Sequence, residues 1–259
     1  MIKKTIGFIG GGRITRILLE GLKKGEVQFT KVMVSDIDPA ILQKRKDMFP
    51  YVDVFSDNNR IAASADLVFL SLHPPVLANV LKDIRKSINT HSILVSLAPK
   101  ITLTRISEIL GGFTRIVRMI PNAPSIVDAG YNPVVFGTGI GQQEKDELLR
   151  LFSALGKCPV VREDVLEAYA VLTGMGPAYF WFQWKKLVEM GASFGIEKSE
   201  AGNAVFHMIE GSAKTFFNSS LSSDAVMDLI PVRPLSGDEE KIKEIYQSHM
   251  EALYKKIKP

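Results

Sequence analysis

The chain has 259 residues, 46% of them hydrophobic, which is enough for one large core or two smaller ones. Its single cysteine, Cys158, excludes an internal disulfide and any multi-cysteine metal site, so we expect a buried structural thiol and no bound metal. The formal charge of +4 comes from basic residues that are spread along the chain, which argues against a nucleic-acid partner. Charge or proline interrupts every apolar stretch well short of a membrane span, and no export signal is visible, so we expect a cytoplasmic protein.

Short apolar runs alternate with amphipathic segments over the first 161 residues. The runs predict strands at 5–9, 31–36, 67–72, 92–97, 115–120 and 132–136. The segments between them predict helices at 13–24, 39–48, 75–86 and 102–110, followed by a helix at 142–155 and a closing strand at 158–161. This alternation predicts an α/β fold, doubly wound, with a mostly parallel sheet and helices on both faces.

Three glycines, Gly10, Gly11 and Gly12, follow the first strand directly and open the helix at Arg13. In this context Gly10 can make a tight turn and Gly12 lets the backbone approach a pyrophosphate, whose charge the helix N-terminus stabilises. The third position of the G-x-G-x-x-G/A pattern is Thr15, which departs from the small residue expected there. We interpret residues 1–162 as a dinucleotide-binding Rossmann-type domain; the alternative is a turn without a ligand.

An acidic residue, Asp36, ends the second predicted strand, where such a side chain usually meets the ribose 2′-hydroxyl of NAD. The position favours NAD over NADP. Two observations leave the choice open. Asp38 and Pro39 could make this stretch only a capped helix start, and Lys44 and Arg45 leave room for a 2′-phosphate.

Helical periodicity replaces the strand pattern after residue 163, at 164–194, 198–217 and 239–257. A loop with two prolines and a glycine, residues 230–237, interrupts it. We expect residues 163–259 to form a helical domain. Its aromatic and methionine side chains, as in Tyr179-Phe180-Trp181-Phe182, exceed what so small a domain needs alone, although they could also fill a monomer core.

Three segments together resemble the pyrroline-5-carboxylate reductases, which reduce a cyclic imine acid to proline with NADPH or NADH. They are Gly7-Phe8-Ile9-Gly10-Gly11-Gly12, Arg118-Met119-Ile120-Pro121-Asn122-Ala123-Pro124 and Leu172-Thr173-Gly174-Met175-Gly176-Pro177-Ala178-Tyr179. Weaker similarity is found at Leu72-His73-Pro74 and Ser96-Leu97-Ala98. The resemblance implies an NAD(P)H-dependent oxidoreductase of proline biosynthesis that forms a homodimer through its helical domain.

The chain departs from this family where the substrate loop S-P-G-G-T-T is expected. Residues 230–235 keep only the proline, so both hydroxyls are lost and Pro234 removes a backbone amide donor. His207-Met208 replaces a Gln-Thr pair of the family, and Met175 replaces a serine. The cation Arg233 is new in this loop and could hold a substrate carboxylate, or be a solvated loop charge. The substrate can therefore differ from pyrroline-5-carboxylate.

The candidate catalytic residues are Asn122, His73 and Arg233. Asn122 follows the strand at 115–120 and can offer its amide to the nicotinamide, and His73 is a candidate proton donor or cofactor contact. The turns and the resemblance together predict the cofactor contacts as Gly7, Ile9, Gly10, Gly11, Gly12, Arg13, Ile14, Ser35, Asp36, Ser71, Leu72, His73, Pro74, Ala98 and Asn122. A rival hypothesis is a regulatory or scaffold protein that binds the dinucleotide but has lost catalysis.

Overall fold

The computed structural model describes residues 2–259, with side chains from Lys4 onward. Its contacts divide the chain into two compact units, which we call the sheet unit and the helical unit. The sheet unit comprises the residues up to Met175 together with Leu253–Pro259, and the helical unit comprises Gly176–Ala252. The sequence placed a boundary after residue 162. Residues 163–175 group with the sheet because Glu163 and Glu167 pair with Arg118 of a central strand.

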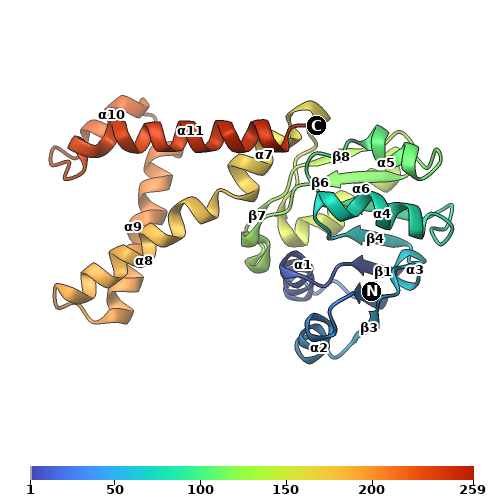
Figure 1. The fold of residues 1–259 in the computed structure, drawn as a ribbon. Helices are drawn as coiled ribbons and strands as arrows, with labels where there is room; N and C mark the ends of the chain where they lie inside the picture. Colours follow the sequence, from blue (N-terminus) through green and yellow to red (C-terminus); the bar gives the residue numbers. More distant parts are fainter. Residues whose placement is uncertain (1) are drawn as a thin grey trace. The chain divides into compact units, whose positions relative to one another are not determined.

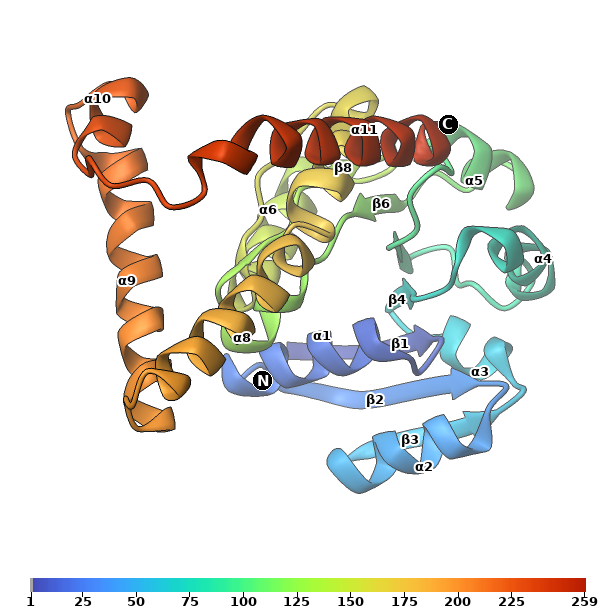
Figure 2. The ribbon, with the colours of Figure 1, turned by 60° about the vertical axis from the view of Figure 1, so that its left-hand side comes forward.

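A seven-stranded sheet forms the centre of the first unit, in the order β3-β2-β1-β4-β5-β6-β8 (Figures 1 and 2). Every neighbouring pair is parallel except β6 and β8, which confirms the expected mostly parallel α/β fold. The strands are β1 Ile2–Ile9, β2 Phe29–Asp36, β3 Val52–Ser56, β4 Leu67–Leu70, β5 Ile93–Ser96, β6 Ile116–Met119 and β8 Val134–Phe136. A separate parallel pair joins β7 Gly130–Tyr131 to β9 Gly156–Lys157.

Helices cover both faces of this sheet, as a doubly wound fold requires. On one face, α1 Arg13–Lys24, α2 Pro39–Met48 and α6 Gln142–Phe152 pack against a core that includes Phe8 and Phe69, whose rings stack 5.0 Å apart. On the other face lie α3 Asn59–Ala63, α4 Pro74–Ile84 and α5 Leu103–Ile109. The two apolar layers bury both faces, which explains why the central strands are apolar almost throughout.

Two predicted elements of the sheet unit differ in the structure. Cys158–Val161 forms no strand; Val160 makes an isolated bridge to Val134, and the short strand β9 precedes it. The helix expected at 164–194 is interrupted. It begins as α7 Leu166–Tyr169, continues as a π-helical turn at Ala170–Gly174 and restarts as α8 Pro177–Ser193. Two glycines lower the helix propensity at this point and Pro177 has no backbone N–H.

The helical unit contains the rest of α8, then α9 Lys198–Asn218, α10 Ser223–Asp228 and most of α11 Glu239–Ile257, with a short 3-10 turn at Ser236–Asp238. Along α8 to α11 the one buried residue among those described is Ala201, which packs against Gly191 of α8. The prolines and Gly237 keep Leu229–Leu235 out of regular structure, as expected. None of the described helices is long and apolar enough to cross a membrane.

Candidate functional site

The strand order reverses direction between β1 and β4. From β1 the chain runs outward through β2 and β3, then returns to place β4 on the other side of β1 (Figure 2). Open α/β sheets bind ligands at such a switch point, at the carboxyl ends of the strands. Backbone hydrogen bonds hold the strand ends together here: Gly10 N donates to Ser35 O, and Ser71 N donates to Ile9 O, both at 2.8 Å.

The glycine turn has the geometry that its sequence predicts. Gly10 has φ +96°, and a Cβ added to it would lie 2.5 Å from the carbonyl oxygen of Ser71, so only glycine fits. The Thr15 hydroxyl donates to the carbonyl of Gly10 at 2.5 Å and is fully buried. Thr15, which departs from the G-x-G-x-x-G/A pattern, therefore adds a hydrogen bond that stabilises the turn.

The N-terminus of α1 is open toward a ligand. Gly12 is the N-cap of this helix, makes no side-chain cap bond and has no heavy atom within 4 Å of its Cβ position. No acidic residue occupies the first helical turn. The free backbone amides and the helix dipole therefore suit an anion such as a pyrophosphate, and the residues present fit a dinucleotide.

Asp36 lies at the carboxyl end of β2, beside this turn. Its carboxylate accepts from Gly11 N at 2.7 Å and from Asp38 N at 2.9 Å. A carboxylate has about four lone-pair sites, so two are left for ribose hydroxyls. The helix start is served separately by Asp38, which caps α2 by accepting from Ala40 N, with Pro39 as first helical residue. The capped helix start is thus confirmed at Asp38 and Pro39, and the ribose contact of Asp36 stays a prediction.

Arg45 approaches the glycine turn from α2. Its Nε donates to the carbonyl of Gly11 at 2.7 Å, and the side chain is 7% exposed. Burial, and then the nearby Arg16, hold the pKa of this guanidinium below its usual range. Lys44 is exposed. Gly11 is therefore held by Asp36 at its amide and by Arg45 at its carbonyl. Arg45, the arginine considered for a 2′-phosphate, thus uses its Nε in the turn.

Two buried serine hydroxyls lie at the carboxyl ends of β4 and β5. Among the described residues, the buried Oγ atoms of Ser71 and Ser96 have no hydrogen-bond partner. His73 is exposed and is the N-cap of α4, without a side-chain cap bond, and Pro74 is the first helical residue. Unsatisfied polar atoms in a native fold call for an explanation, and a polar ligand at this edge supplies one.

Asn122 leaves β6 at the same edge and is 6% exposed. Its Nδ2 donates to the carbonyl of Thr173 at 3.3 Å and its Oδ1 accepts from Tyr131 N at 3.1 Å. Its backbone N donates to the side chain of Asn132 at 3.0 Å. Through these bonds Asn122 joins three segments of the sheet unit. One N–H of its side-chain amide is left for a cofactor.

The remaining predicted contacts fall into three groups. Ile9, Ser35 and Ala98 are buried at the ends of β1, β2 and β5. Gly7 lies inside β1, where an added Cβ would be 2.0 Å from the carbonyl of Ala62, so its small size serves helix packing. Residues at the turns complete the set: Gly11 is buried, Arg13 is exposed, and the partly exposed ones are Gly12, Ile14, Ser71 and Leu72.

Arg233 belongs to the helical unit, in the exposed loop between α10 and α11. Its guanidinium donates to the carbonyl of Met227 at 3.1 Å. The loop also exposes Ile230, Val232 and Leu235, each about two-thirds or more accessible. That Arg233 acts together with Asn122 and His73 stays a prediction.

Arg118 has no predicted role, and the structure places it at the centre of a buried ion cluster. It is fully buried in β6 and pairs with Glu163 at 2.9 Å and Glu167 at 2.5 Å. The signal in the sequence is a charge inside the apolar run Ile116-Val117-Arg118-Met119. A buried arginine requires acidic partners, and the pair at i and i+4 in 163–167 could have been proposed as these partners.

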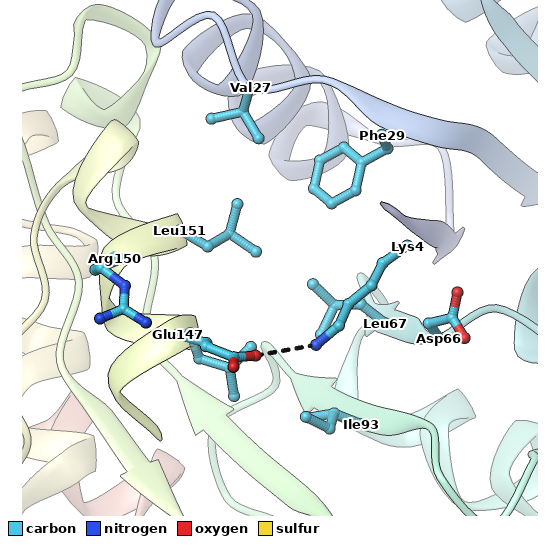
Figure 3. A pocket seen from close by; sticks show the side chains of 10 residues that line it. Lys4, Val27, Phe29, Asp66, Leu67, Ile93, Glu147, Arg150 and Leu151 are labelled. Carbon is cyan, nitrogen blue, oxygen red and sulfur yellow. Dashed lines mark hydrogen bonds and ion pairs between the residues drawn. The ribbon is translucent and has the colours of Figure 1, made fainter. Parts of the chain in front are cut away.

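The opposite edge of the sheet has a cavity of about 350 Å³ (Figure 3). Val27, Phe29, Leu67, Ile93 and Leu151 give it apolar walls, and Lys4 pairs with Glu147 at 3.4 Å across it. These residues come from the amino ends of the strands and from α6. This cavity is therefore remote from the glycine turn, and it is not part of the candidate site.

Comparison with known proteins gives two family matches. Residues 5–100 match the family described as NADP oxidoreductase coenzyme F420-dependent, and residues 163–230 match pyrroline-5-carboxylate reductase dimerisation. The curated pyrroline-5-carboxylate reductase of Escherichia coli K12 is 26% identical over 88% of this chain and 85% of its own length. Pyrroline-5-carboxylate reductase 3 of Xenopus laevis is 28% identical over 83% and 78%.

The chain is similar to the pyrroline-5-carboxylate reductases over most of its length. Solved structures agree in fold. The pyrroline carboxylate reductase of Plasmodium falciparum, solved with NADP bound, gives a TM-score of 0.85 at 21% identity, covering 100% of this chain and 98% of that one. The enzyme of Streptococcus pyogenes gives 0.82 at 21% identity, covering 99% and 98%.

The limits of the reductase dimerisation match coincide with the departure found in the sequence. The match begins at Glu163, a member of the buried ion cluster, and ends at Ile230, where the altered loop begins. It therefore covers α7 to α10 and does not extend to the loop that contains Arg233 or to α11.

Proposed function

We propose that the chain is an NAD(P)H-dependent reductase that transfers hydride to the C=N bond of a cyclic imine acid, 1-pyrroline-5-carboxylate or a related imine. The observation that carries this proposal is the turn at Gly10–Gly12, in which Gly10 has a conformation that only glycine allows and Gly12 leaves the N-terminus of α1 open. Similarity to the pyrroline-5-carboxylate reductases supports the reaction class. The route would serve the formation of proline.

When bound, the nicotinamide supplies the hydride, and the protein's share is binding, orientation and exclusion of water. The amides at the start of α1 would hold the pyrophosphate, and Asp36 would accept from ribose hydroxyls. Asn122 would orient the nicotinamide with its remaining N–H, and His73 would hold the proton that the imine nitrogen takes up.

The glycine turn is tested by Gly12→Ala. Because no heavy atom lies within 4 Å of the Cβ position, the variant should fold with unchanged thermal stability. It should bind NADH at least about tenfold more weakly, because the methyl group occupies the space of a pyrophosphate at a site that needs close backbone approach. Titration of NADH fluorescence measures this. Unchanged binding would show that the dinucleotide lies elsewhere.

We further propose that NADH is preferred to NADPH. Asp36 would repel a 2′-phosphate, and Arg45, the nearby cation, already donates to Gly11. Asp36→Asn should reduce the ratio of NADPH to NADH dissociation constants. Asp38→Asn is the matched control, because asparagine also caps helices and Asp38 does not bond the turn. If wild-type protein binds NADPH as tightly as NADH, this preference is wrong.

The substrate carboxylate is assigned to Arg233. Arg233→Met should raise the KM for 1-pyrroline-5-carboxylate and change kcat less, because binding of a remote charge contributes to ground state and transition state alike. Met is close in length and carries no charge. An unchanged KM would exclude the assignment.

We propose a homodimer through the helical unit. Its helices expose large apolar side chains in number, among them Phe182, Phe194, Phe206 and Phe217, each 60% or more accessible. Exposed apolar side chains in this number favour an interface. The match of residues 163–230 to a dimerisation family supports the same face.

A further inference from the structure

The ion cluster of Arg118, Glu163 and Glu167 joins distant parts of the sheet unit. Arg118 Nη1 donates to Glu163 at 2.9 Å and Nη2 donates to Glu167 at 2.5 Å, while Nε has no partner among the described residues. Arg118 is fully buried and Glu167 is 1% exposed. Removing such charges from water costs several kcal/mol per ion, so stability alone is a weak explanation for the cluster.

Each carboxylate also holds the loop that follows β5. Glu167 accepts from Lys100 N at 3.0 Å, and Glu163 accepts from Leu103 N at 2.7 Å. Lys100 has φ +75°, a left-handed conformation that is unfavourable for a residue with a side chain. The loop begins at Leu97 and includes Ala98, a predicted cofactor contact. Glu167 thus holds Lys100 in its unfavourable conformation, and Glu163 holds the end of the loop.

The segment that carries these acids also reaches Asn122. Thr173, at the end of the π-helical turn, accepts from the Asn122 amide at 3.3 Å. The following Gly174 packs closely on Ile120, since an added Cβ would lie 3.1 Å from its side chain. Residues 163–174 therefore run from the ion cluster to the amide expected at the nicotinamide.

The adenosine side of the turn is held by other contacts. Asp36 and Arg45 bond to Gly11, and Thr15 bonds to Gly10. None of these bonds involves the ion cluster, so the two halves of the candidate site have separate supports.

We propose that Arg118 is a positioning residue that acts through Glu163 and Glu167. It fixes the Ala98–Lys100 turn and the Asn122 amide, and so shapes the nicotinamide half of the cofactor site while leaving the adenosine half unchanged. The inference rests on the proposed dinucleotide site and assigns a specific support to one half of it.

A second ion pair provides a matched control. Arg115, just before the other end of β6, donates to Glu144 at 2.5 and 3.1 Å, and the two side chains are 23% and 32% exposed. The chemistry is the same, but the pair lies at the amino edge of the sheet, remote from the glycine turn. Loss of either pair should lower stability, and only loss of the Arg118 pairs should affect the nicotinamide half.

The test compares Glu167→Gln with Glu144→Gln in the full chain, using calorimetric titration with ADP-ribose and with NADH. Glu167→Gln should weaken NADH binding about tenfold, the scale of one charge-assisted hydrogen bond, and change ADP-ribose binding less than about twofold. Glu144→Gln should change neither. Glu163→Gln, at a carboxylate that is 29% exposed, should give the same pattern and replaces Glu167→Gln if that variant fails to fold.

Three outcomes would overturn the proposal: equal weakening of both ligands, no change in either, or the same pattern in Glu144→Gln. Wild-type protein that binds neither ADP-ribose nor NADH would instead contradict the proposed function. The two failures are therefore distinguishable in one set of titrations.

Discussion

The sheet unit and the helical unit differ in how far they bury their apolar side chains. In the sheet unit, both faces of the sheet are covered, and Phe8, Phe69 and Phe152 form one packed aromatic group. In the helical unit, Ala201 is the one buried residue along the described helices, and many of the large apolar side chains are exposed. The first unit buries its apolar side chains within one chain, whereas the second leaves many of its own exposed, which supports the proposed dimer.

Their charged groups differ in the same way. In the sheet unit, Arg115 with Glu144 and Arg118 with Glu167 join segments far apart in the sequence. In the helical unit the ion pairs, such as Lys214 with Glu210, connect residues one helical turn apart. Local pairs support a helix but do not fix a tertiary structure. A unit with few tertiary contacts of its own is suited to assembly.

The largest expected effect concerns assembly. Phe206→Glu, at a side chain that is 60% exposed, should convert the dimer to a monomer, because a charge buried without a partner costs several kcal/mol. Sedimentation equilibrium at micromolar concentration measures it. The control is Val160→Glu, at a similarly exposed apolar residue of the sheet unit, which should leave the dimer intact. A wild-type monomer, or a dimer that tolerates Phe206→Glu, would contradict the proposal that the exposed apolar side chains of the helical unit form the dimer interface.

Truncation of a buried and of an exposed phenylalanine tests the difference between the two units. Phe152→Ala should lower the free energy of unfolding of the sheet unit by about 3–5 kcal/mol, since Phe152 is fully buried. Phe217→Ala, at a side chain that is 78% exposed, should leave that unit's denaturant midpoint within error and weaken dimer association instead. Urea titration and sedimentation separate the two effects. Similar loss of stability in both variants would contradict the description of two different units.

The long-range ion pairs predict a pH effect. The hydrogen bond from Arg115 holds the pKa of Glu144 below its usual range, although burial opposes it. The stabilisation is therefore complete above the unfolded pKa, about 4.3, and is lost as pH falls through the lower folded pKa. Wild type should exceed Glu144→Gln in urea midpoint at pH 7, and the difference should shrink below pH 4. A difference that is constant with pH would exclude the ion pair as its source.

The smallest effect concerns Cys158. Burial raises the pKa of its thiol to about 11. The thiolate is thus scarce at neutral pH, and the folded chain should react with iodoacetamide far more slowly than the urea-unfolded chain. Mass spectrometry over time measures the two rates. Equal rates would show that the sheet unit is not closed around this thiol.

The sequence predicted what depends on local pattern. The helices at 13–24, 39–48 and 239–257 begin and end where their periodicity and caps indicate. The strand Val52–Ser56 and the helix Asn59–Ala63 were missed, because an edge strand with partial burial and a five-residue helix carry little periodicity. The helix α10 was missed for the same reason.

Some features of the candidate site could likewise be predicted from the sequence, and others could not. The glycine turn and Asp36 could be found because strand, turn and helix are contiguous in the sequence. The hydrogen bonds from Thr15 to Gly10 and from Arg45 to Gly11 depend on folded geometry, so no spacing rule indicated them. The contribution of Arg233 stays a prediction, since it depends on a loop that departs from the family pattern.

The reductase activity is tested most directly by following NADH absorbance while wild-type protein is mixed with 1-pyrroline-5-carboxylate and a panel of related cyclic imines and oxoacids. We predict NADH oxidation at an ordinary enzymatic rate with at least one cyclic imine acid, and loss of that activity in Gly12→Ala. Saturable NADH binding without turnover on any member of the panel would contradict the proposal and favour a regulatory or scaffold protein.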